Sequence, residues 1–267
     1  MKVYSVDNTR YNRSLGFRSC LRTYYPVIKP EIFAQDLVRT STNLFREDLN
    51  WKFLTKYIIF NFLKTNKVNT YSLAGSDGSE AYSFAVMMMS KLPESMYNKF
   101  FPIISSDIDR NVLEGANSRR INIHDCEFAM TNRNYHLDLN DYFVNPDMPL
   151  QIQNDDIKWA EKHKLLSYEP IDELKQAVQF RHSDILTELS QIKDEGNSIV
   201  FCRNVMPYLK ESYVNDVIKT ASEKLKTGSL FITGEYDDKA NITAKLNAAG
   251  FYQPVLEYSH IFQRNYT

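Results

Sequence analysis

The stretch TYSLAGSDGSEAYSFAVMMMSK, residues Thr70–Lys91, decides the fold class. Its first five residues, Thr70–Ala74, are typical of a short strand, and Gly75–Ser79 is rich in turn-forming residues. Apolar residues then recur with helical spacing over Glu80–Lys91. A strand, a glycine-containing turn and a helix in direct succession predict the first half of a βαβ unit.

The same alternation recurs along the rest of the chain. Further strands are predicted at 101–105, 198–202 and 229–233, further helices at 109–118, 210–226 and 238–249, and one or two strands at 252–264. Strands that alternate with helices favour a mostly parallel sheet with right-handed crossovers. The sequence therefore predicts an α/β, Rossmann-like sheet with flanking helices.

Two regions depart from this alternation. Residues 30–67 show a helical pattern that is clearest over Trp51–Lys64, which predicts a small helical N-terminal domain at 1–68 in front of the α/β domain at 69–267. Residues 120–175 are polar and irregular, and they predict a divergent insertion. Short strands are expected within it at 135–139, 149–153 and 165–168.

Composition narrows the class of protein. The 267 residues are 43% apolar and 24% charged, which suits a globular protein with a substantial core. The longest apolar runs fall well short of the roughly 18 to 20 residues that span a membrane. The first residues lack the apolar segment of a secretory signal. We therefore expect a cytoplasmic protein.

Charge is unevenly distributed between the two ends of the chain. Residues 1–70 contain 12 Lys or Arg and 5 Asp or Glu, whereas the remainder contains 20 and 28. Such asymmetry is consistent with a basic N-terminal region that meets an acidic partner, or with an ordinary solvated helical surface. Nucleic acid is a weaker alternative, because no DNA- or RNA-binding motif accompanies the charge.

Polar residues stand where the predicted strands end, and parallel sheets bind ligands at that edge. Gly75 and Gly78 predict a loop whose backbone approaches a cofactor, although many strand-to-helix turns carry two glycines. Asp107 is placed to accept hydrogen bonds from both ribose hydroxyls, or else to cap a helix, a role that suits Asp109 better. Arg203 and Asn204 follow a buried strand and are expected to face the same crevice.

Other reactive residue types give no comparable pattern. The five histidines are scattered without metal-ligand spacing, so we predict no metal site. Cys202 falls in a predicted core strand and is expected to be inert. Tyr208, at a strand-to-helix junction, is either functional or one of many packing tyrosines.

Four segments together resemble the CheR family, S-adenosylmethionine-dependent methyltransferases that esterify glutamates on chemotaxis receptors. Thr42–Glu47 (TNLFRE) is similar to the family's T-x-F-F-R-E segment, and Gly78–Ser83 (GSEAYS) to its G-E-E-P-Y-S loop. Ser106–Glu114 (SDIDRNVLE) is similar to S-D-I-D-x-x-V-L-E, and Phe201–Tyr208 (FCRNVMPY) to F-C-R-N-V-M-I-Y. The last two segments are long and specific.

The resemblance implies a role for individual residues of this chain. Thr40, Thr42 and Arg46 would reach the cofactor from the N-terminal region, and Ala74 and Glu80 would contact its methionine end. Asp107 would hold the ribose, and Asp184 and Ile185 would lie near the adenine. Arg203 and Asn204 would line the cleft beside the transferred methyl group, and Tyr208 would point at the reacting carboxylate.

Several positions depart from the family's pattern. Ser79 replaces the first Glu of the acidic loop, Ala81 replaces its Pro, and Asp184 stands where Asn is usual. The loop before Gly78 is one residue shorter. Residues 120–175 occupy the place of a small β-subdomain that docks partners in the chemoreceptor enzymes.

The resemblance implies O-methylation of a protein glutamate, with S-adenosylmethionine as cofactor and S-adenosylhomocysteine as product. Two alternatives remain open. One is a methyltransferase with a different acceptor, because both substrate-facing regions diverge. The other is a degenerate module that binds S-adenosylmethionine or S-adenosylhomocysteine as a sensor or scaffold, which the altered loop at Ser79 favours.

Overall fold

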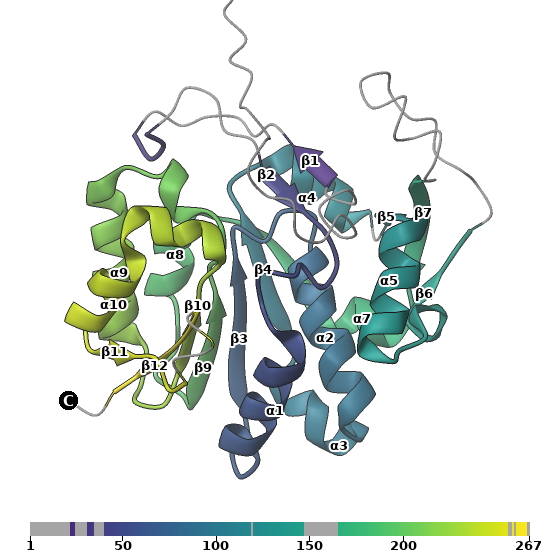
Figure 1. Ribbon diagram of the computed structural model, residues 1–267, viewed down its shortest axis with the longest axis horizontal. Coiled ribbons are helices and arrows are strands. Elements are labelled where there is room, and N and C mark those ends of the chain that lie inside the picture. Colours follow the sequence, from purple (N-terminus) through teal and green to yellow (C-terminus); the bar gives the residue numbers. More distant parts are fainter. Residues whose placement is uncertain are drawn as a thin grey trace, which may run out of the picture.

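A computed structural model gives the arrangement of residues 22–24, 31–34, 40–118, 120–146, 165–255, 258 and 260–265 (Figure 1). Its strands are β1 (Arg22–Tyr24), β2 (Thr40–Thr42), β3 (Val68–Leu73), β4 (Ile103–Asp107), β5 (Ile121–His124), β6 (Phe143–Val144), β7 (Leu165–Pro170), β8 (Val178–His182), β9 (Asn197–Phe201), β10 (Leu230–Ile232), β11 (Phe251–Tyr252) and β12 (Ile261–Arg264). Its α-helices are α1 (Trp51–Phe62), α2 (Ser79–Lys91), α3 (Glu94–Tyr97), α4 (Arg110–Asn117), α5 (Asp125–Tyr135), α7 (Asp172–Ala177), α8 (Ile185–Ser190), α9 (Glu211–Lys224) and α10 (Ile242–Ala248). Short 3-10 helices are η2 (Asn98–Phe100), η3 (Leu139–Asp141), η4 (Met206–Tyr208) and η5 (Glu235–Ala240).

The central sheet has seven strands in the order β11-β12-β10-β9-β3-β4-β8. The five strands from β10 to β8 are parallel, and β12 and β11 extend the sheet in antiparallel fashion. The predicted α/β class with a mostly parallel sheet is confirmed. The chain runs from β3 outward through β4 to β8 and then returns to β9 on the other side of β3, which creates a topological switch point between β3 and β9. Crevices at such points are where these sheets bind ligands.

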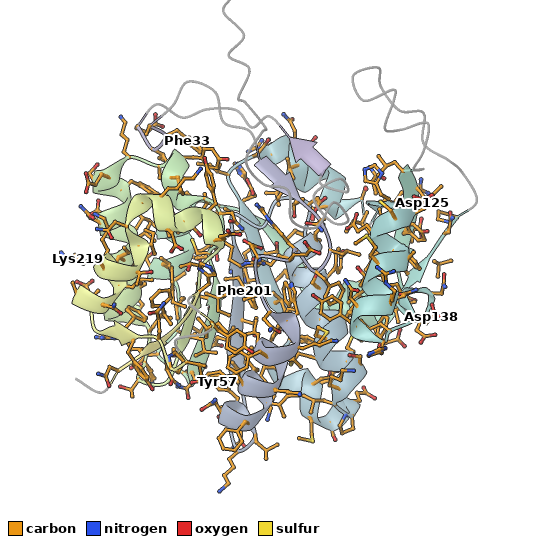
Figure 2. The ribbon with its side chains drawn as sticks, in the orientation of Figure 1. Phe33, Tyr57, Asp125, Asp138, Phe201 and Lys219 are labelled. Carbon is orange, nitrogen blue, oxygen red and sulfur yellow. The ribbon has the colours of Figure 1, made fainter. Side chains whose placement is uncertain are left out.

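Alternation along β9 shows how the sheet is covered on both faces. Ile199 and Phe201 belong to a core that includes α1 and α2, whereas Val200 and Cys202 belong to a second core with α8, α9 and α10. Successive strand residues point to opposite faces, so one apolar run serves two cores. In Figure 1, α8, α9 and α10 lie on one side of the central strands, with α1 and α2 on the other. Figure 2 shows Phe201 near the middle of the molecule.

A small antiparallel sheet, β5-β7-β6, lies within the divergent segment 120–175. It flanks α5 at one side of the molecule (Figure 1). The strand predicted at 165–168 is confirmed as part of β7. The strand predicted at 135–139 is wrong, because α5 runs to Tyr135 and the left-handed His136 ends it. The strand predicted at 149–153 lies outside the described residues.

The N-terminal region enters the same core as the central sheet. The helix predicted from Trp51 is confirmed as α1, with the side chain of Asn50 accepting a hydrogen bond from the Phe53 N–H at 3.0 Å. The helical pattern is wrong for residues 40–50, which form β2 and turns. Much of 1–39 lies outside the described residues, so the boundary at 68 stays a prediction. Among the described residues, no helix has the length and apolar character needed to cross a membrane.

Candidate functional site

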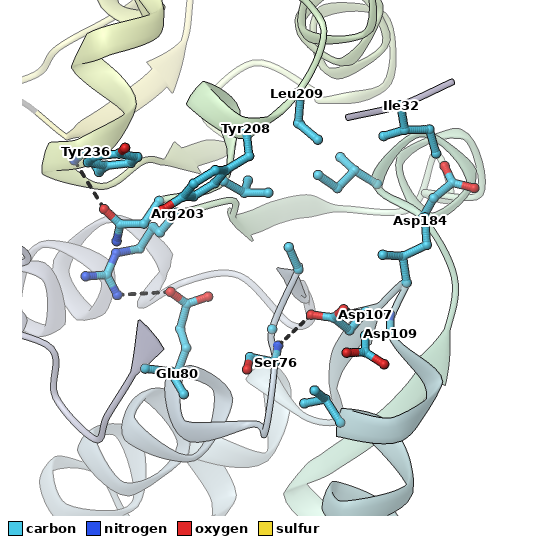
Figure 3. A pocket seen from close by; sticks show the side chains of 18 of the residues that line it. Ile32, Ser76, Glu80, Asp107, Asp109, Asp184, Arg203, Tyr208, Leu209 and Tyr236 are labelled. Carbon is cyan, nitrogen blue, oxygen red and sulfur yellow. Dashed lines mark hydrogen bonds and ion pairs between the residues drawn. The ribbon is translucent and has the colours of Figure 1, made fainter. Parts of the chain in front are cut away.

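A cavity of about 310 Å³ opens at the carboxyl ends of β3, β4 and β9, at the switch point of the sheet (Figure 3). Residues from distant parts of the chain line it: Ile32, Phe33, Thr42, Asn43, Arg46, Trp51, Ala74, Gly75, Ser76, Glu80, Asp107, Ile108, Asp109, Val112, Ser183, Asp184, Ile185, Arg203, Asn204, Val205, Tyr208, Leu209, Tyr213 and Tyr236. Of the residues predicted for the site, eleven are in this lining: Thr42, Arg46, Ala74, Gly75, Glu80, Asp107, Asp184, Ile185, Arg203, Asn204 and Tyr208.

The turn after β3 brings backbone to the floor of the cavity. A Cβ on Gly75 would collide with the side chain of Ser105 on the neighbouring strand, so no larger residue fits there. Ala74 and Ser76, on either side of Gly75, have left-handed φ angles of 55° and 52°. Such conformations are costly outside glycine and gather at functional sites. The Ser76 hydroxyl is buried in the cavity wall without a hydrogen-bond partner among the described residues.

Gly78 has a different environment from Gly75. Its φ is 86°, and a Cβ there would lie 2.6 Å from the ring of Phe180. It precedes the first residue of α2 and is absent from the cavity lining. Packing and backbone conformation therefore explain why glycine is needed at this position. Direct contact between Gly78 and the cofactor stays a prediction.

Asp107 ends β4 with its carboxylate at the cavity. One oxygen accepts a hydrogen bond from the backbone N–H of Ser76, and the other from that of Asp109, both at 2.9 Å. Burial raises the pKa of Asp107, although these backbone donors oppose the shift. The alternative role of helix cap belongs to Asp109, whose side chain accepts from the Asn111 N–H at 2.9 Å at the start of α4.

The far end of the cavity is largely apolar, with Ile108, Val112, Ile185 and Leu209 in its wall. Asp184 caps α8 there (Figure 3). Its carboxylate accepts hydrogen bonds from the N–H and hydroxyl of Thr187 at 3.0 and 2.8 Å, and from the Tyr213 hydroxyl at 3.0 Å. Burial alone would raise the pKa of Asp184, but these donors outweigh it and lower the pKa.

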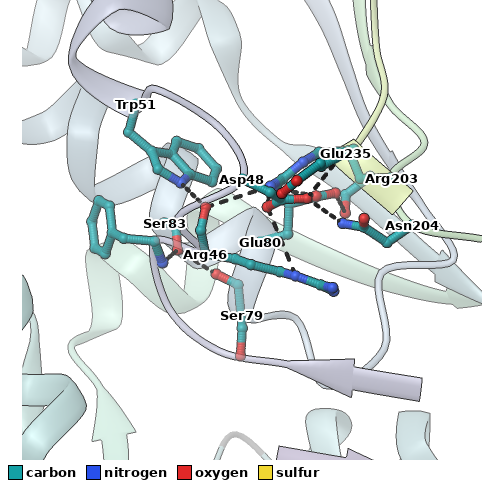
Figure 4. A network of polar contacts seen from close by, with 12 residues as sticks. Arg46, Asp48, Trp51, Ser79, Glu80, Ser83, Arg203, Asn204 and Glu235 are labelled. Carbon is teal, nitrogen blue, oxygen red and sulfur yellow. Dashed lines mark hydrogen bonds and ion pairs between the residues drawn. The ribbon is translucent and has the colours of Figure 1, made fainter. Parts of the chain in front are cut away.

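The opposite end holds a buried chain of charges centred on Arg203 (Figure 4). The Arg203 guanidinium donates to Glu80 Oε2 at 2.9 Å and to Asp48 Oδ1, and it lies 5.6 Å from the centre of the Trp51 ring. Glu80 also accepts from the Ser72 hydroxyl at 2.7 Å. Burial raises the pKa of Glu80, and the Arg203 charge opposes the shift. Burial would lower the pKa of Arg203, but Asp48 and Glu80 raise it.

Asn204 follows Arg203 with a left-handed φ of 59°. Its side-chain amide donates to Asp48 Oδ2 at 2.7 Å and accepts from the Tyr236 N–H at 3.2 Å. Asp237 accepts from the backbone N–H groups of Gly234 (2.8 Å), Asn204 (2.7 Å), Val205 (3.0 Å) and Met206 (2.9 Å). The loop after β10 thereby fixes the loop after β9.

Two aromatic rings border the cavity next to this charged chain. Tyr208, on η4, lies 5.4 Å from Tyr236 between ring centres at a tilt of 31° (Figure 3). The backbone of Tyr208 accepts the Ala34 N–H at 2.8 Å, and the Lys210 N–H donates to Ile32 at 2.9 Å. Segment 31–34 thus pairs with the loop that carries Tyr208.

The segment Asn43–Asp48 is held against α2 and α5 before it reaches the cavity. The Phe45 N–H donates to the Ser83 hydroxyl at 2.8 Å, and the Leu44 N–H donates to Glu127 at 2.5 Å. The buried rings of Phe45 and Trp51 meet edge to face at 5.7 Å. Arg46 and Thr42 therefore line the cavity. The side chain of Thr40 is not among those that the structure describes.

Sequence reasoning missed several residues that shape the site. Ser76, Asp109, Tyr213 and Tyr236 line the cavity, and Asp48 and Asp237 support it from behind. Ser76 and Asp109 carried a local signal, since Ser76 lies between the two glycines of the turn and Asp109 lies two residues after Asp107. The others are brought to the site by contacts between elements that are distant in sequence.

Comparisons with known proteins agree with the resemblance found in the sequence. A family model described as "CheR methyltransferase, SAM binding domain" matches residues 40–136 and 150–250. Chemotaxis protein methyltransferase 2 of Vibrio cholerae is 20% identical, over 95% of this chain and 86% of that protein. The chemotaxis protein methyltransferase of Listeria innocua is 24% identical, over 71% of this chain and 62% of that protein.

Solved structures show only weak overall likeness. An O-methyltransferase family protein from Burkholderia thailandensis has a TM-score of 0.43 and 10% identity, over 80% of this chain and 56% of that one. The family match therefore carries the assignment, since it spans most of the chain and includes the four segments that line or support the cavity. The chain belongs to the CheR family of S-adenosylmethionine-dependent methyltransferases.

Proposed function

We propose that this chain transfers the methyl group of S-adenosylmethionine to a side-chain carboxylate, a glutamate, of an acceptor protein. The family match and the relatives named as chemotaxis protein methyltransferases support the reaction class. The observation that carries the choice of acceptor is the composition of the cavity wall. Its described residues include no His, Cys or Lys, and its carboxylates are already engaged, because Asp107, Asp109 and Asp184 accept backbone N–H groups and Glu80 is paired with Arg203, so a neutral acceptor has no evident base.

The residues of the cavity fit the cofactor along its length. The Asp107 carboxylate and the unpartnered Ser76 hydroxyl suit the ribose hydroxyls. The apolar wall around Ile185 suits the adenine ring, and the buried Glu80 carboxylate suits the ammonium group. When bound, S-adenosylmethionine supplies a methyl group on a positively charged sulfur, which is open to attack by an anion.

The chain's own residues have a limited chemical task with a carboxylate acceptor. A glutamate is already ionised near neutral pH, so orientation and exclusion of water do most of the work. We assign the orientation of the acceptor to Tyr208 and Arg203, which lie at the same end of the cavity (Figure 3). Asn204 completes that wall, and its side chain is fixed from both sides by Asp48 and the backbone of Tyr236.

The residues that replace those of the family's acidic loop do not alter the wall of the cavity. Ser79 is fully buried, and its N–H and hydroxyl donate to Asp77 at 3.0 and 2.5 Å at the start of α2. Neither Ser79 nor Ala81 is in the cavity lining. These substitutions are therefore compatible with an active enzyme, and they give little support to the scaffold alternative.

We infer that the acceptor is a protein with an acidic surface that meets the basic N-terminal region. The excess of Lys and Arg in residues 1–70 supports this, as does the position of segment 31–34 beside the Tyr208 loop. The cytoplasmic location expected from the sequence stays a prediction.

Transfer of a labelled methyl group tests the proposal. The full chain is incubated with methyl-labelled S-adenosylmethionine and candidate acceptor proteins, and the labelled product is treated with mild base. Label released as volatile methanol reports a carboxyl ester and supports the proposal. Label that is transferred but stable to base would show a different acceptor group.

A further inference from the structure

Asp48 is a buried carboxylate that none of the motifs singled out, yet it contacts Arg203, Arg46 and Asn204 at the charged end of the cavity. Its side chain is 9% exposed. One oxygen accepts from the Arg203 guanidinium and lies 3.7 Å from Arg46 Nε. The other accepts from the Asn204 side-chain amide at 2.7 Å and from the Glu235 N–H at 3.4 Å. Figure 4 shows these contacts together.

The arrangement divides Arg203 between two carboxylates. Glu80 approaches one terminal nitrogen and Asp48 the other, and the Arg203 side chain is only 3% exposed. A guanidinium held on both sides keeps one fixed position in the cavity wall, so it presents the same face to an incoming acceptor. Asp48 also fixes the amide of Asn204, so a single carboxylate sets the positions of two adjacent residues of the cavity wall.

Charge gives Asp48 a second effect. The charged chain pairs two guanidiniums, Arg46 and Arg203, with Glu80 and Asp48, and the Asp237 carboxylate lies behind it. Removing the charge of Asp48 makes the end of the cavity assigned to the cofactor's methionine portion more positive by one unit. In a poorly solvated site this change disfavours a sulfonium cation strongly, but it has little effect on a neutral thioether.

We propose that Asp48 is a positioning residue for methyl transfer, which fixes Arg203 and Asn204 and balances their charge so that the site accepts a sulfonium. This inference rests on the proposed function. It assigns to Asp48 the preference of the site for S-adenosylmethionine over S-adenosylhomocysteine, since the two ligands differ at sulfur by one methyl group and one positive charge.

Calorimetric titration of the full chain with both ligands tests the inference. Asp48→Asn preserves the size of the side chain and removes its charge. It is expected to weaken S-adenosylmethionine binding about tenfold more than S-adenosylhomocysteine binding. The matched control is Glu188→Gln, because Glu188 is a buried carboxylate paired with Arg181 at 3.5 Å outside the cavity lining. That variant is expected to leave the ratio of the two affinities unchanged.

The outcomes separate the possible failures. Equal weakening of both ligands in Asp48→Asn would show a merely structural role and overturn the inference. If the wild-type chain binds neither ligand, the proposed function fails and the inference fails with it. If Asp48→Asn does not fold, Asp48→Glu tests the inference instead, because it keeps the negative charge. It is expected to keep the wild-type affinity ratio within about threefold, and loss of that ratio would contradict the inference.

Discussion

The carboxylate of Asp237 accepts the backbone N–H of Asn204 at 2.7 Å and thereby joins the loop after β10 to the loop after β9. Three more backbone N–H groups donate to the same carboxylate, from Gly234, Val205 and Met206. Asn204 has a left-handed φ of 59°, which Asn adopts more readily than most residues, and these hydrogen bonds hold the loop in that conformation. The geometry of the charged end of the cavity therefore depends on a residue outside its lining.

Asp237→Asn is expected to destabilise the chain, because an amide cannot accept on both sides as a carboxylate does and buried N–H groups lose their partners. We expect a loss of about 2–3 kcal/mol in the free energy of unfolding. Urea titration measures it, with Asp238→Asn as the exposed neighbouring control. Equal stability of the two variants would show that the four hydrogen bonds do not hold the loop.

Gly75→Ala tests the close approach of the turn to β4. The new Cβ would collide with Ser105, so the strand or the turn must shift, at a cost of about 1–3 kcal/mol and with weaker cofactor binding. Gly115→Ala is the matched control, since nothing lies within 4 Å of its added Cβ on α4. That change is expected to stabilise the chain by about 0.5–1 kcal/mol. Thermal unfolding of both variants measures these changes. A Gly75→Ala variant as stable as the wild type would contradict the predicted collision with Ser105.

Asp107→Ala tests the predicted ribose contact. Loss of the carboxylate is expected to weaken S-adenosylhomocysteine binding by about 1–3 kcal/mol, because ligand hydroxyls lose their acceptor and the Ser76 turn loses its support. Asp138→Ala serves as the control, since Asp138 caps η3 in the small β-sheet unit. Affinity that does not change in Asp107→Ala would remove Asp107 from the site.

Tyr208→Phe separates acceptor contacts from cofactor contacts. Loss of the hydroxyl is expected to leave S-adenosylhomocysteine affinity nearly intact and to lower the turnover of methyl transfer, because the acceptor loses an orienting group. Calorimetry gives the affinity, and the initial rate of labelled transfer gives the turnover. A fall in cofactor affinity instead would assign Tyr208 to the cofactor.

The contacts of Asp48 predict that the free energy of unfolding depends on pH. Burial would raise the pKa of Asp48, but Arg203 and Arg46 outweigh it and lower the pKa from its ordinary value. A carboxylate with a lowered folded pKa stabilises the native state above its unfolded pKa, and this contribution is lost as the pH falls through the folded pKa. The stability difference between wild type and Asp48→Asn should be about 3 kcal/mol at pH 7 and should shrink below about pH 4. A difference that is constant down to pH 3 would contradict this.

The central sheet was predictable because its strands carry strong local patterns. Ile199–Cys202 is a short apolar run that ends abruptly, and Thr70–Lys91 contains a strand, a turn and a helix in one stretch. The edge strand β8 was missed, since most of its residues are partly or fully exposed and it lacks an apolar run. In α5 the buried Glu127 and Thr131 weaken the helical apolar pattern, so the sequence did not reveal it.

The site residues that lie at the end of a single strand could be predicted from the sequence. Asp107 and Arg203 are polar residues at such ends, and the topology of the sheet brings them to one edge. Asp48 and Asp237 could not be found in this way. Asp48 acts on Arg203 across 155 residues of sequence, and Asp237 acts on Asn204 from another loop. These pairs form where the segment between β2 and α1, and the loop after β10, meet the loop after β9.

Calorimetric titration of the purified wild-type chain with S-adenosylmethionine tests whether the cavity at the carboxyl ends of β3, β4 and β9 is a cofactor site. We expect saturable binding with one ligand per chain and micromolar or tighter affinity, together with binding of S-adenosylhomocysteine at the same site. Absence of saturable binding by either ligand, in a chain shown to be folded, would contradict it.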